Sequence, residues 1–335
     1  MTRYACVGID ISAKTAEFQI QTPEGKIRRG EIPNTPRGHQ QLLRTLTQKP
    51  GQIRACLEAT GVYGLDLAVV LARHPKIKLC ILNPRQAKRF ADVLKKRSKT
   101  DPIDAEVLCE YAQRMDFEAW EPPPKAAMQL RALGRRMHQL TEMKVQEKNR
   151  LHAATSSEEL AILRQPIQQT LETLEDAIEQ VETLALEVVN SEPGLRRAFD
   201  HLCSIRGVAT TSAVKILGEL SVLPKDMTQR QWVAHAGLDP RHHESGTSVH
   251  RQPRISKQGN RYLRAALYMP AHTAAHFEPS VKAFYERLVG RGKAKMQAKV
   301  AVMRKLLHAM HGMLRYGEDF DGDKFSPAAF PLKQV

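Results

Sequence analysis

Residues 4–12, YACVGIDIS, are the stretch that decides the fold of the first part of the chain. A short and almost continuous apolar run predicts a strand that is buried on both of its faces. The next stretch, AEFQIQT at 16–22, alternates apolar and polar side chains and predicts a second strand. KIRRGEIP at 26–33 predicts a third strand, and the turn residues PEGK at 23–26 join the two into a hairpin.

Helices and strands alternate along the next part of the chain. IRACLEA at 53–59 and KIKLCIL at 76–82 predict strands, and apolar spacing predicts helices over 37–47 and 65–73. Asn83-Pro84 and Asp101-Pro102 each place a capping residue before proline, which is typical of a helix start. The order β-β-β-α-β-α-β-α is that of ribonuclease-H-like folds, so we predict an α/β N-terminal domain of that class.

The middle of the chain has the pattern of a helical insert. WEPPP at 120–124 interrupts secondary structure, and a long helical stretch follows over 125–153. Apolar residues then recur at heptad spacing, at Ile167, Leu171, Leu174, Ile178, Val181, Ala185 and Val188. A seam of this kind predicts a coiled coil. The alternative is a single amphipathic helix that packs against its own domain.

The rest of the chain is predicted to be mostly helical. Residues 199–220 are expected to form two helices joined by a glycine turn, similar to a helix-hairpin-helix element, with Ala209 in place of the usual second glycine. Apolar spacing predicts further helices over 261–275 and 294–316. The last stretch, DGDKFSPAAFPLKQV at 321–335, is expected to be a flexible tail.

The charge of the chain favours a polyanionic partner. Its 335 residues include 51 Lys and Arg against 36 Asp and Glu, which gives a formal net charge of +15. Acids concentrate in 156–192, whereas basic residues concentrate in 85–99 and 241–315. Two basic regions that flank an acidic insert indicate a nucleic-acid-binding protein with two contact regions. The alternative for each basic run, taken alone, is a solvated helix face.

Composition also restricts the class of protein and its compartment. Hydrophobic residues make up 42% of the chain, which is enough for packed cores and excludes wholesale disorder. No run of about 18 apolar residues is present, so we expect no membrane-spanning helix. The N-terminus lacks the apolar stretch of a signal peptide. Five scattered cysteines without a CxxC pair favour neither a zinc site nor a disulfide framework, so we expect a cytoplasmic protein.

Four carboxylic acids occupy positions that suit one shared metal site. Asp10 and Glu58 end two predicted strands, where an acid is costly to bury unless it is paired or binds a cation. Asp101 and Asp104 are three residues apart at a predicted helix start and share one face of that helix. Mg²⁺ prefers oxygen ligands and would relieve their mutual repulsion. Lys99 adds positive charge for phosphate. The alternative for each acid alone is a cap or a surface residue.

Short blocks in both halves of the chain carry a resemblance to a known family. GIDIS at 8–12, LEATG at 57–61 and KTDPIDA at 99–105 resemble the signature blocks of the DEDD transposases of the insertion-sequence one-ten family, which are bridge-RNA-guided recombinases. The glycine turn at 207–213 and AGLDPRHHESGTSVHRQPRISKQGNRYLRAALYMPA at 236–271 resemble the same family. The resemblance extends over about residues 5–320.

The resemblance implies four parts of the chain. Residues 1–155 would be a RuvC-like domain, 156–192 an acidic coiled coil that joins protomers, 193–320 a mostly α-helical transposase domain, and 321–335 the tail. The metal ligands that it implies are Asp10, Glu58, Asp101 and Asp104. It further implies Mg²⁺ as cofactor, and donor DNA, target DNA and a guide (bridge) RNA as partners. The expected assembly is a homo-oligomer in which dimers form a tetramer.

The nucleophile that the resemblance implies is Ser245, in ESGTS at 244–248. On sequence alone, a serine before glycine is typical of a turn. Basic residues surround it and are the predicted nucleic-acid contacts: Arg241, Arg251, Arg254, Lys257, Arg261 and Arg264. A serine hydroxyl needs a base, a metal or cationic surroundings before it attacks phosphate. Ser248 and Ser256 are weaker candidates, and His242 and His243 are interpreted as surface residues, with a part in proton transfer left open.

Two other functions stay open beside an RNA-guided recombinase that cuts and rejoins DNA through a covalent phosphoserine intermediate. The first is a RuvC-like, Mg²⁺-dependent Holliday-junction nuclease that uses the acids and water. The second is a non-catalytic nucleic-acid-binding regulator, against which the complete set of four acids argues. Aromatic residues amount to 5% of the chain, which is low for base-stacking platforms. We therefore expect binding through nucleic-acid backbones, with base pairing supplying sequence choice.

Overall fold

The computed structural model describes residues 4–59, 61, 63–94, 101–245 and 249–325, without the side chains of 101–103 and 242–253. The chain divides into two compact units, Met1–Pro122 and Pro123–Val335. The division falls inside the predicted breaker WEPPP and not at the predicted domain boundary after residue 155. The reason is that helix α5, Lys125–Thr155, packs along α6 and α8 of the second unit. Within the described residues, no helix is both long and apolar enough to cross a membrane.

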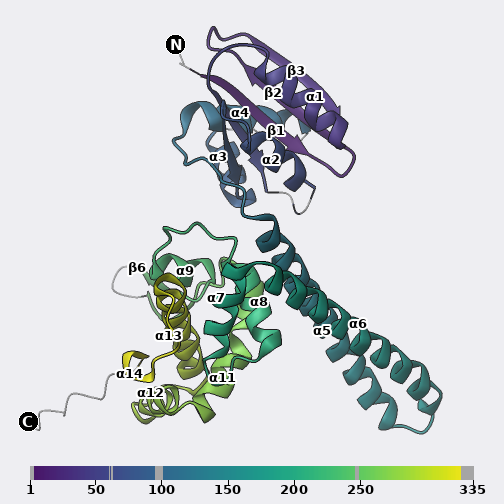
Figure 1. Cartoon of the computed structure of the whole chain (residues 1–335), viewed down its shortest axis with the longest axis vertical. Helices are drawn as coiled ribbons and strands as arrows, with labels where there is room; N and C mark the ends of the chain where they lie inside the picture. The colour runs from purple at the N-terminus through teal and green to yellow at the C-terminus, as the bar shows by residue number, and fades with distance from the viewer. Residues whose placement is uncertain (1–3, 60, 62, 95–100, 246–248, 326–335) are drawn as a thin grey trace, which may run out of the picture. The chain divides into compact units, whose positions relative to one another are not determined.

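The first unit is built on a five-stranded mixed sheet (Figure 1). Its strands are β1 Ala5–Ile11, β2 Thr15–Gln21, β3 Ile27–Pro33, β4 Ile53–Glu58 and β5 Ile77–Leu82, in the spatial order β3-β2-β1-β4-β5. β2 is antiparallel to both β1 and β3, whereas β4 is parallel to β1 and to β5. The central strand β1 is covered on both faces, which explains its continuous apolar run. All five predicted strands are confirmed.

Helices cover both faces of this sheet. On one face, β1 presents Val7, Ile9 and Ile11 to a core that includes residues of α1, Pro36–Thr47, and α2, Leu65–Ala72. On the other face, a second cluster contains residues of α3, Pro84–Val93, and α4, Asp101–Arg114. Asn83 caps α3 as predicted, because its side chain accepts a hydrogen bond from the Arg85 backbone N–H at 2.9 Å. The mixed α/β character expected of the N-terminal part is thus confirmed.

A long helical hairpin begins the second unit (Figure 1). It consists of α5, a short 3₁₀ turn at Ala161–Leu163, and α6, Arg164–Ser191. The helices run antiparallel, because Lys144 pairs with Glu175 at 2.7 Å while Arg164, at the start of α6, donates to the Ala154 carbonyl oxygen at 3.1 Å. The heptad residues Leu171, Leu174 and Ala185 are buried as α6 runs along α5. Part of the predicted seam is therefore covered within the chain, and the coiled coil between protomers stays a prediction.

The remainder of the second unit is mostly helical, as predicted. Its helices are α7 Pro193–Cys203, α8 Thr210–Leu220, α9 Gln229–His235, α10 Arg261–Ala266, α11 Tyr268–Phe277, α12 Pro279–Gly290, α13 Lys295–Tyr316 and α14 Gly322–Phe325. They share one core with Leu130 and Met137 of α5 and Ala185 and Val189 of α6. α7 and α8 form the predicted helical pair, and the Gly207 turn between them lies closely against α11.

Among the described residues, four parts of the second unit were not expected from the sequence. They are α9, α12, α14 and a β-hairpin of β6, Pro240–Ser245, and β7, Val249–Ile255. α14 lies inside the segment 321–335 that was predicted to be a flexible tail. Phe325 of α14 is buried, with its ring 5.9 Å from that of Phe284 and 5.6 Å from that of Phe320. Aromatic packing therefore orders the first part of that segment, and residues 326–335 lie outside the described chain.

Candidate functional site

The position of α4 on the sheet is set by Gly8 in β1. A Cβ at this position would lie 2.0 Å from the Ala105 carbonyl oxygen and 2.2 Å from the Cys109 backbone nitrogen, so only glycine permits this approach. Two residues earlier in β1, the carbonyl oxygen of Cys6 accepts a hydrogen bond from Cys109 Sγ at 3.4 Å. Ala105 of α4 lies at Gly8 of β1, whereas the Cys109 side chain, one turn later in α4, reaches Cys6, which is earlier in β1. The helix is therefore antiparallel to the strand, and its first turn lies toward the strand's C-terminal end.

Asp10 and Glu58 lie at that same end of the sheet. In the parallel pairing of β1 with β4, Gly8 is level with Cys56 and Ile9 with Leu57, which brings Asp10 level with Glu58. Side chains two residues apart on a strand point to the same face. Because Gly8 faces α4, Asp10 faces it too. Cys56 belongs to the cluster on the same face of the sheet, so Glu58, two residues later in β4, also points to that face. Both acids are half-buried.

The other two predicted acids come from the first turn of α4. Asp104 directly precedes Ala105, which covers Gly8, and it is half-buried. Asp101 is the first residue of α4, one turn further toward the strand ends, and its side chain lies outside the described part of the structure. The fold thus directs all four backbone positions to one edge of one sheet face. Among the residues that the structure describes, no group of three or more His, Cys, Asp or Glu side chains is arranged to hold a metal ion.

Four cysteines lie in the core cluster on the sheet face that α4 covers. Cys6, Cys56, Cys80 and Cys109 come from β1, β4, β5 and α4, and all four are buried in one cluster. Burial raises the pKa of the Cys109 thiol to about 12, and a hydrogen bond with Cys80 raises the pKa of Cys56. Buried cysteines pack as small apolar side chains. The cysteines that are scattered in the sequence therefore belong to one core cluster, on the sheet face that α4 covers.

Ser245 is the last residue of β6. The strand pairs antiparallel with β7, and Ser245 lies opposite Val249, next to residues 246–248, which are outside the described chain. The register also places Arg241 opposite Arg254 and His243 opposite Arg251. The hairpin therefore presents a serine beside its turn, between strands that carry several basic positions. Lys99, Ser248 and the side chains of Ser245, His242, His243 and Arg251 are not described by the structure.

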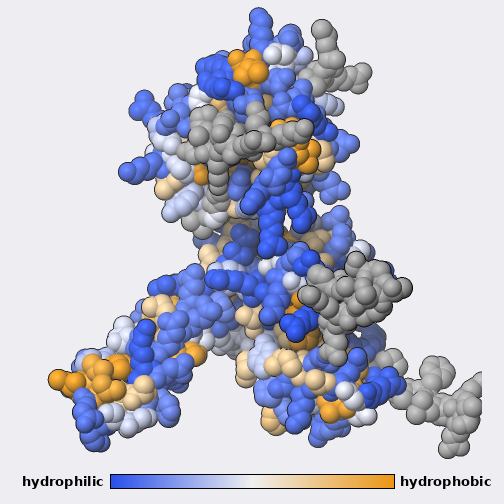
Figure 2. All heavy atoms as spheres, turned by 180° about the vertical axis from the view of Figure 1, so that it is seen from behind, coloured by the Kyte–Doolittle hydropathy of each residue, from blue (hydrophilic) through white to orange (hydrophobic). Residues whose placement is uncertain are grey.

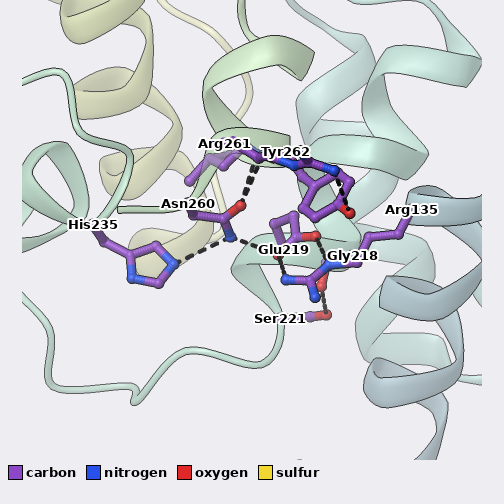
Figure 3. Close-up of polar contacts among 9 residues, drawn as sticks. Arg135, Gly218, Glu219, Ser221, His235, Asn260, Arg261 and Tyr262 are labelled. Atoms are coloured by element: carbon purple, nitrogen blue, oxygen red, sulfur yellow. Dashed lines mark hydrogen bonds and ion pairs between the residues drawn. The ribbon is translucent and has the colours of Figure 1, made fainter. Parts of the chain in front are cut away.

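A buried network of hydrogen bonds holds the start of α10, the helix that follows this hairpin in the sequence (Figure 3). Glu219 of α8 is almost fully buried and accepts two hydrogen bonds from Arg135 of α5, at 2.5 and 2.9 Å. It also accepts one from Asn260 Nδ2 at 2.6 Å. Asn260 in turn caps α10, because its Oδ1 accepts from the backbone N–H groups of Tyr262 and Leu263 at 3.0 and 3.1 Å. A buried carboxylate thus ties α5, α8 and the start of α10 together.

Sequence reasoning missed this network. The hydrogen bond of Glu219 with Arg135 raises the pKa of that guanidinium, and burial lowers the pKa of His235, whose ring lies 3.3 Å from Asn260 Nδ2. The available signal was a lone acid in the apolar helix TTSAVKILGEL, since a buried acid needs partners. Its partners could not be identified, because they are far away in the sequence.

The predicted nucleic-acid contacts fall into two groups. Arg241, Arg254, Lys257 and Arg261 are exposed. Arg264 is half-buried, and its Nη1 donates to the Ala236 carbonyl oxygen at 2.9 Å. Part of its role is therefore to hold the loop after α9. The exposed members leave their charges available to phosphate groups.

Comparison with known proteins matches both units to transposases. Residues 7–157 match a family model of DEDD transposases of the IS110 type, and residues 200–286 match the transposase IS116/IS110/IS902 family. The pilin gene-inverting protein of Moraxella bovis is 30% identical over 267 residues, 79% of this chain and 81% of that protein. Its namesake in Moraxella lacunata matches equally. An uncharacterised insertion element IS110 protein of Streptomyces coelicolor is 29% identical over 120 residues, 36% of this chain and 29% of that protein.

These matches and the two units define the class, which is that of DNA-cleaving transposases and recombinases. The chain belongs to the IS110 family of transposases, which confirms the resemblance carried by its short sequence blocks. The first family match continues through α5 to residue 157, near the predicted boundary at 155, although the compact unit itself ends at Pro122. α5 therefore belongs both to the first matched region and to the second compact unit.

Proposed function

We propose that the chain is an RNA-guided DNA recombinase of an insertion sequence, with Ser245 as nucleophile and a carboxylate metal site in its first unit. The observation that carries the proposal is the placement of Asp10 and Glu58 beside the first turn of α4, which supplies Asp101 and Asp104. The sheet order β3-β2-β1-β4-β5, with β2 antiparallel and β4 parallel to β1, supports a ribonuclease-H-like, RuvC-like assignment of this unit.

The donor set suits a hard divalent cation. Carboxylate oxygens are the ligands that Mg²⁺ prefers, and burial raises the pKa of the neighbouring Cys109 thiol, which makes it a poor ligand. Asp10, Glu58, Asp101 and Asp104 would hold the ion, which would stabilise charge on the reacting phosphate oxygens.

In the proposed reaction Ser245 Oγ attacks the phosphorus of a DNA phosphodiester. A serine–phosphate bond forms, the bond from phosphorus to the 3′ oxygen breaks, and the serine proton is passed to that oxygen, which leaves as a 3′-hydroxyl. A 3′-hydroxyl of the other DNA then attacks the phosphoserine and restores the serine. Because one ester replaces another in each step, rejoining needs no external energy source.

The partners in this proposal are donor DNA, target DNA, a bridge RNA and further copies of the chain. The net charge of +15 and the exposed Arg241, Arg254, Lys257 and Arg261 support binding to nucleic-acid backbones. The family resemblance supports the guide RNA, which would choose the DNA sequences by base pairing. The helical hairpin of α5 and α6 is the proposed contact between protomers.

The test is recombination in vitro with purified protein, donor DNA, target DNA, Mg²⁺ and RNA transcribed from the DNA that flanks the gene. We expect recombinant product only when the RNA is present, and none from Ser245→Ala or Asp10→Asn protein. Ser248→Ala is the matched control and should recombine normally. Recombination without RNA would overturn the guided mechanism. Cleavage by the Ser245→Ala protein would favour the junction nuclease instead.

A further inference from the structure

A pocket with a volume of about 380 Å³ opens in the second unit between α5, α10 and α13. This volume falls within the range of about 300–1,000 Å³ that is usual for small-ligand sites. All of its lining residues belong to the described chain. The pocket lies beyond the end of β7, because Ile255 is the last residue of that strand and one of the lining residues.

One side of the pocket is strongly cationic. Lys257, Arg261 and Arg264 all line it. The lining has one acid, Glu142, whose Oε1 lies 3.4 Å from His138 Nε2, so the three cations outnumber it. Arg264 donates one hydrogen bond to a backbone carbonyl, and a guanidinium has five N–H donors, so donors are left for a ligand. Such a lining favours an anionic group, and phosphate above all.

The backbone of Lys257 has an unusual conformation. Lys257 has φ 52°, and among the described residues it is the one non-glycine with positive φ. A conformation that favours glycine costs free energy when it carries a long side chain. The turn is fixed by hydrogen bonds from Lys257 N to the Gly237 carbonyl oxygen at 3.1 Å and from Ser256 Oγ to Asp239 at 2.6 Å. These hydrogen bonds fix the backbone position of Lys257, one of the residues that line the pocket.

The other side of the pocket is apolar. Ile255, Val300 and Met303 line it, together with the ring of Tyr268. A site for phosphate alone would not need an apolar wall, whereas a nucleotide has both an anionic phosphate and a flat, largely apolar base. The buried network of Glu219, Arg135 and Asn260 holds α10 firmly against α5 and keeps the pocket open. From this combination we infer that the pocket binds one unstacked nucleotide of a DNA or RNA strand, with its phosphate at Lys257 and Arg261 and its base against the apolar wall.

This inference rests on the proposed function, because it assumes a nucleic-acid ligand. It adds to that function a binding site for one base. The test uses the full chain and two single-stranded oligonucleotides, one DNA and one RNA, each with 2-aminopurine as a fluorescent base. We expect binding to change the fluorescence of at least one strand, because the base leaves its stacked neighbours. The strand that responds identifies the source of the nucleotide.

A variant that fills the pocket distinguishes binding of a base in the pocket from general electrostatic attraction between the protein and nucleic acid. Ala265→Phe places an aromatic ring in the pocket without changing charge, and Ala153→Phe, at an exposed site on α5, is its control. We expect Ala265→Phe to abolish the fluorescence change and to weaken binding about fivefold or more. The control should match wild type. Equal melting temperatures would show that both proteins are folded. An unaltered fluorescence change in Ala265→Phe would overturn the inference.

A charge variant tests the phosphate end independently. Arg261→Ala should lower the slope of log affinity against log salt concentration by about one, since one phosphate contact is lost. Lys295→Ala, an exposed cation outside the pocket lining, is the control and should keep the fluorescence change. If Arg261→Ala keeps both the salt slope and the fluorescence change, the pocket assignment is wrong. If the wild-type chain binds neither strand, the proposed function itself fails.

Discussion

Gly8 is the residue that allows α4 to pack closely against β1. Its missing side chain lets α4 rest on β1, with Ala105, the residue after Asp104, directly over Gly8. We predict that Gly8→Ala lowers the free energy of unfolding by about 1–3 kcal/mol, because the added methyl group overlaps backbone atoms that cannot turn aside. Recombination should fall as well. Chemical denaturation would measure the change, and Gly194→Ala, where a Cβ meets no atom within 4 Å, should cost nothing.

Asp104 tests the proposed metal site directly. Asp104→Ala should abolish recombination while the protein stays folded, because removal of one of several mutually repelling acids does not weaken the apo fold. Glu110→Ala is the control from the same helix; Glu110 pairs with Arg114 at 2.6 Å and is two turns from the strand ends. A normal recombination rate in Asp104→Ala would exclude a role at the metal site, and a collapsed melting transition would make the residue structural.

His235 gives the second unit a pH dependence. Burial lowers its pKa, helped by Arg135 and Arg131 and opposed by Glu219. The unfolded chain therefore takes up a proton near the ordinary pKa of about 6.5, and the folded chain resists it. Stability should be full above that pH and fall as the pH drops below it. We expect His235→Gln to lose less stability than wild type between pH 7.5 and 5.5, by at most about 1.4 kcal/mol per pH unit. Identical slopes in denaturant titrations would contradict this.

At the scale of elements, the sheet was predictable and the β6–β7 hairpin was not. The strands of the sheet have apolar runs or clear alternation, which reflect burial on one or both faces. β7 reads VHRQPRI, so charged residues and a proline obscure its pattern, and its pairing depends on backbone hydrogen bonds. α12 had an available signal, Pro279 at its first position, that was not used.

In the candidate site, too, some residues could be predicted from the sequence and others could not. Asp10 and Glu58 could be chosen from the sequence because acids are rare on buried strands. Gly8 could not, since its importance arises from Ala105 and Cys109 on a distant helix. Glu219 and Asn260 were missed for the same reason, and the four core cysteines of the first unit looked scattered until the sheet brought them together.

The α5–α6 hairpin offers another surface for assembly besides its heptad seam. Part of the seam is covered inside the chain, and the end of the hairpin exposes apolar residues, which Figure 2 shows as a hydrophobic patch. Leu160, Ile162 and Leu163 are exposed there, Ile162 to 81%. Exposed apolar patches mark interaction surfaces.

We therefore predict that Ile162→Glu with Leu163→Glu reduces the mass of the protein in light scattering and lowers recombination, without lowering the melting temperature. The replaced side chains are exposed, so the fold of one chain loses little. Leu174→Lys, in the buried seam, is the contrasting variant and should reduce stability. A double mutant of unchanged mass would place the protomer contact elsewhere.

At the scale of the whole molecule, the two units carry different parts of the proposed chemistry. The first unit holds the acids at the strand ends, and the second holds Ser245 on the β6–β7 hairpin with its basic surroundings. A serine hydroxyl needs activation before it attacks phosphate, and in the proposed reaction a metal ion held by the acids would supply it. The proposed reaction therefore requires that both sets of residues act on one phosphodiester.

The most direct test of this claim is a search for the covalent intermediate. A target with a nick just past the cleavage site loses the strand that would rejoin, so the intermediate should accumulate. We predict a protein–DNA adduct that withstands denaturing gel electrophoresis, requires Mg²⁺ and guide RNA, disappears in Ser245→Ala and persists in Ser248→Ala. Ser245→Ala should still bind the DNA, which shows that chemistry and not affinity was lost. Cleaved DNA with free ends and no adduct from the wild-type chain would contradict the account and support a junction nuclease.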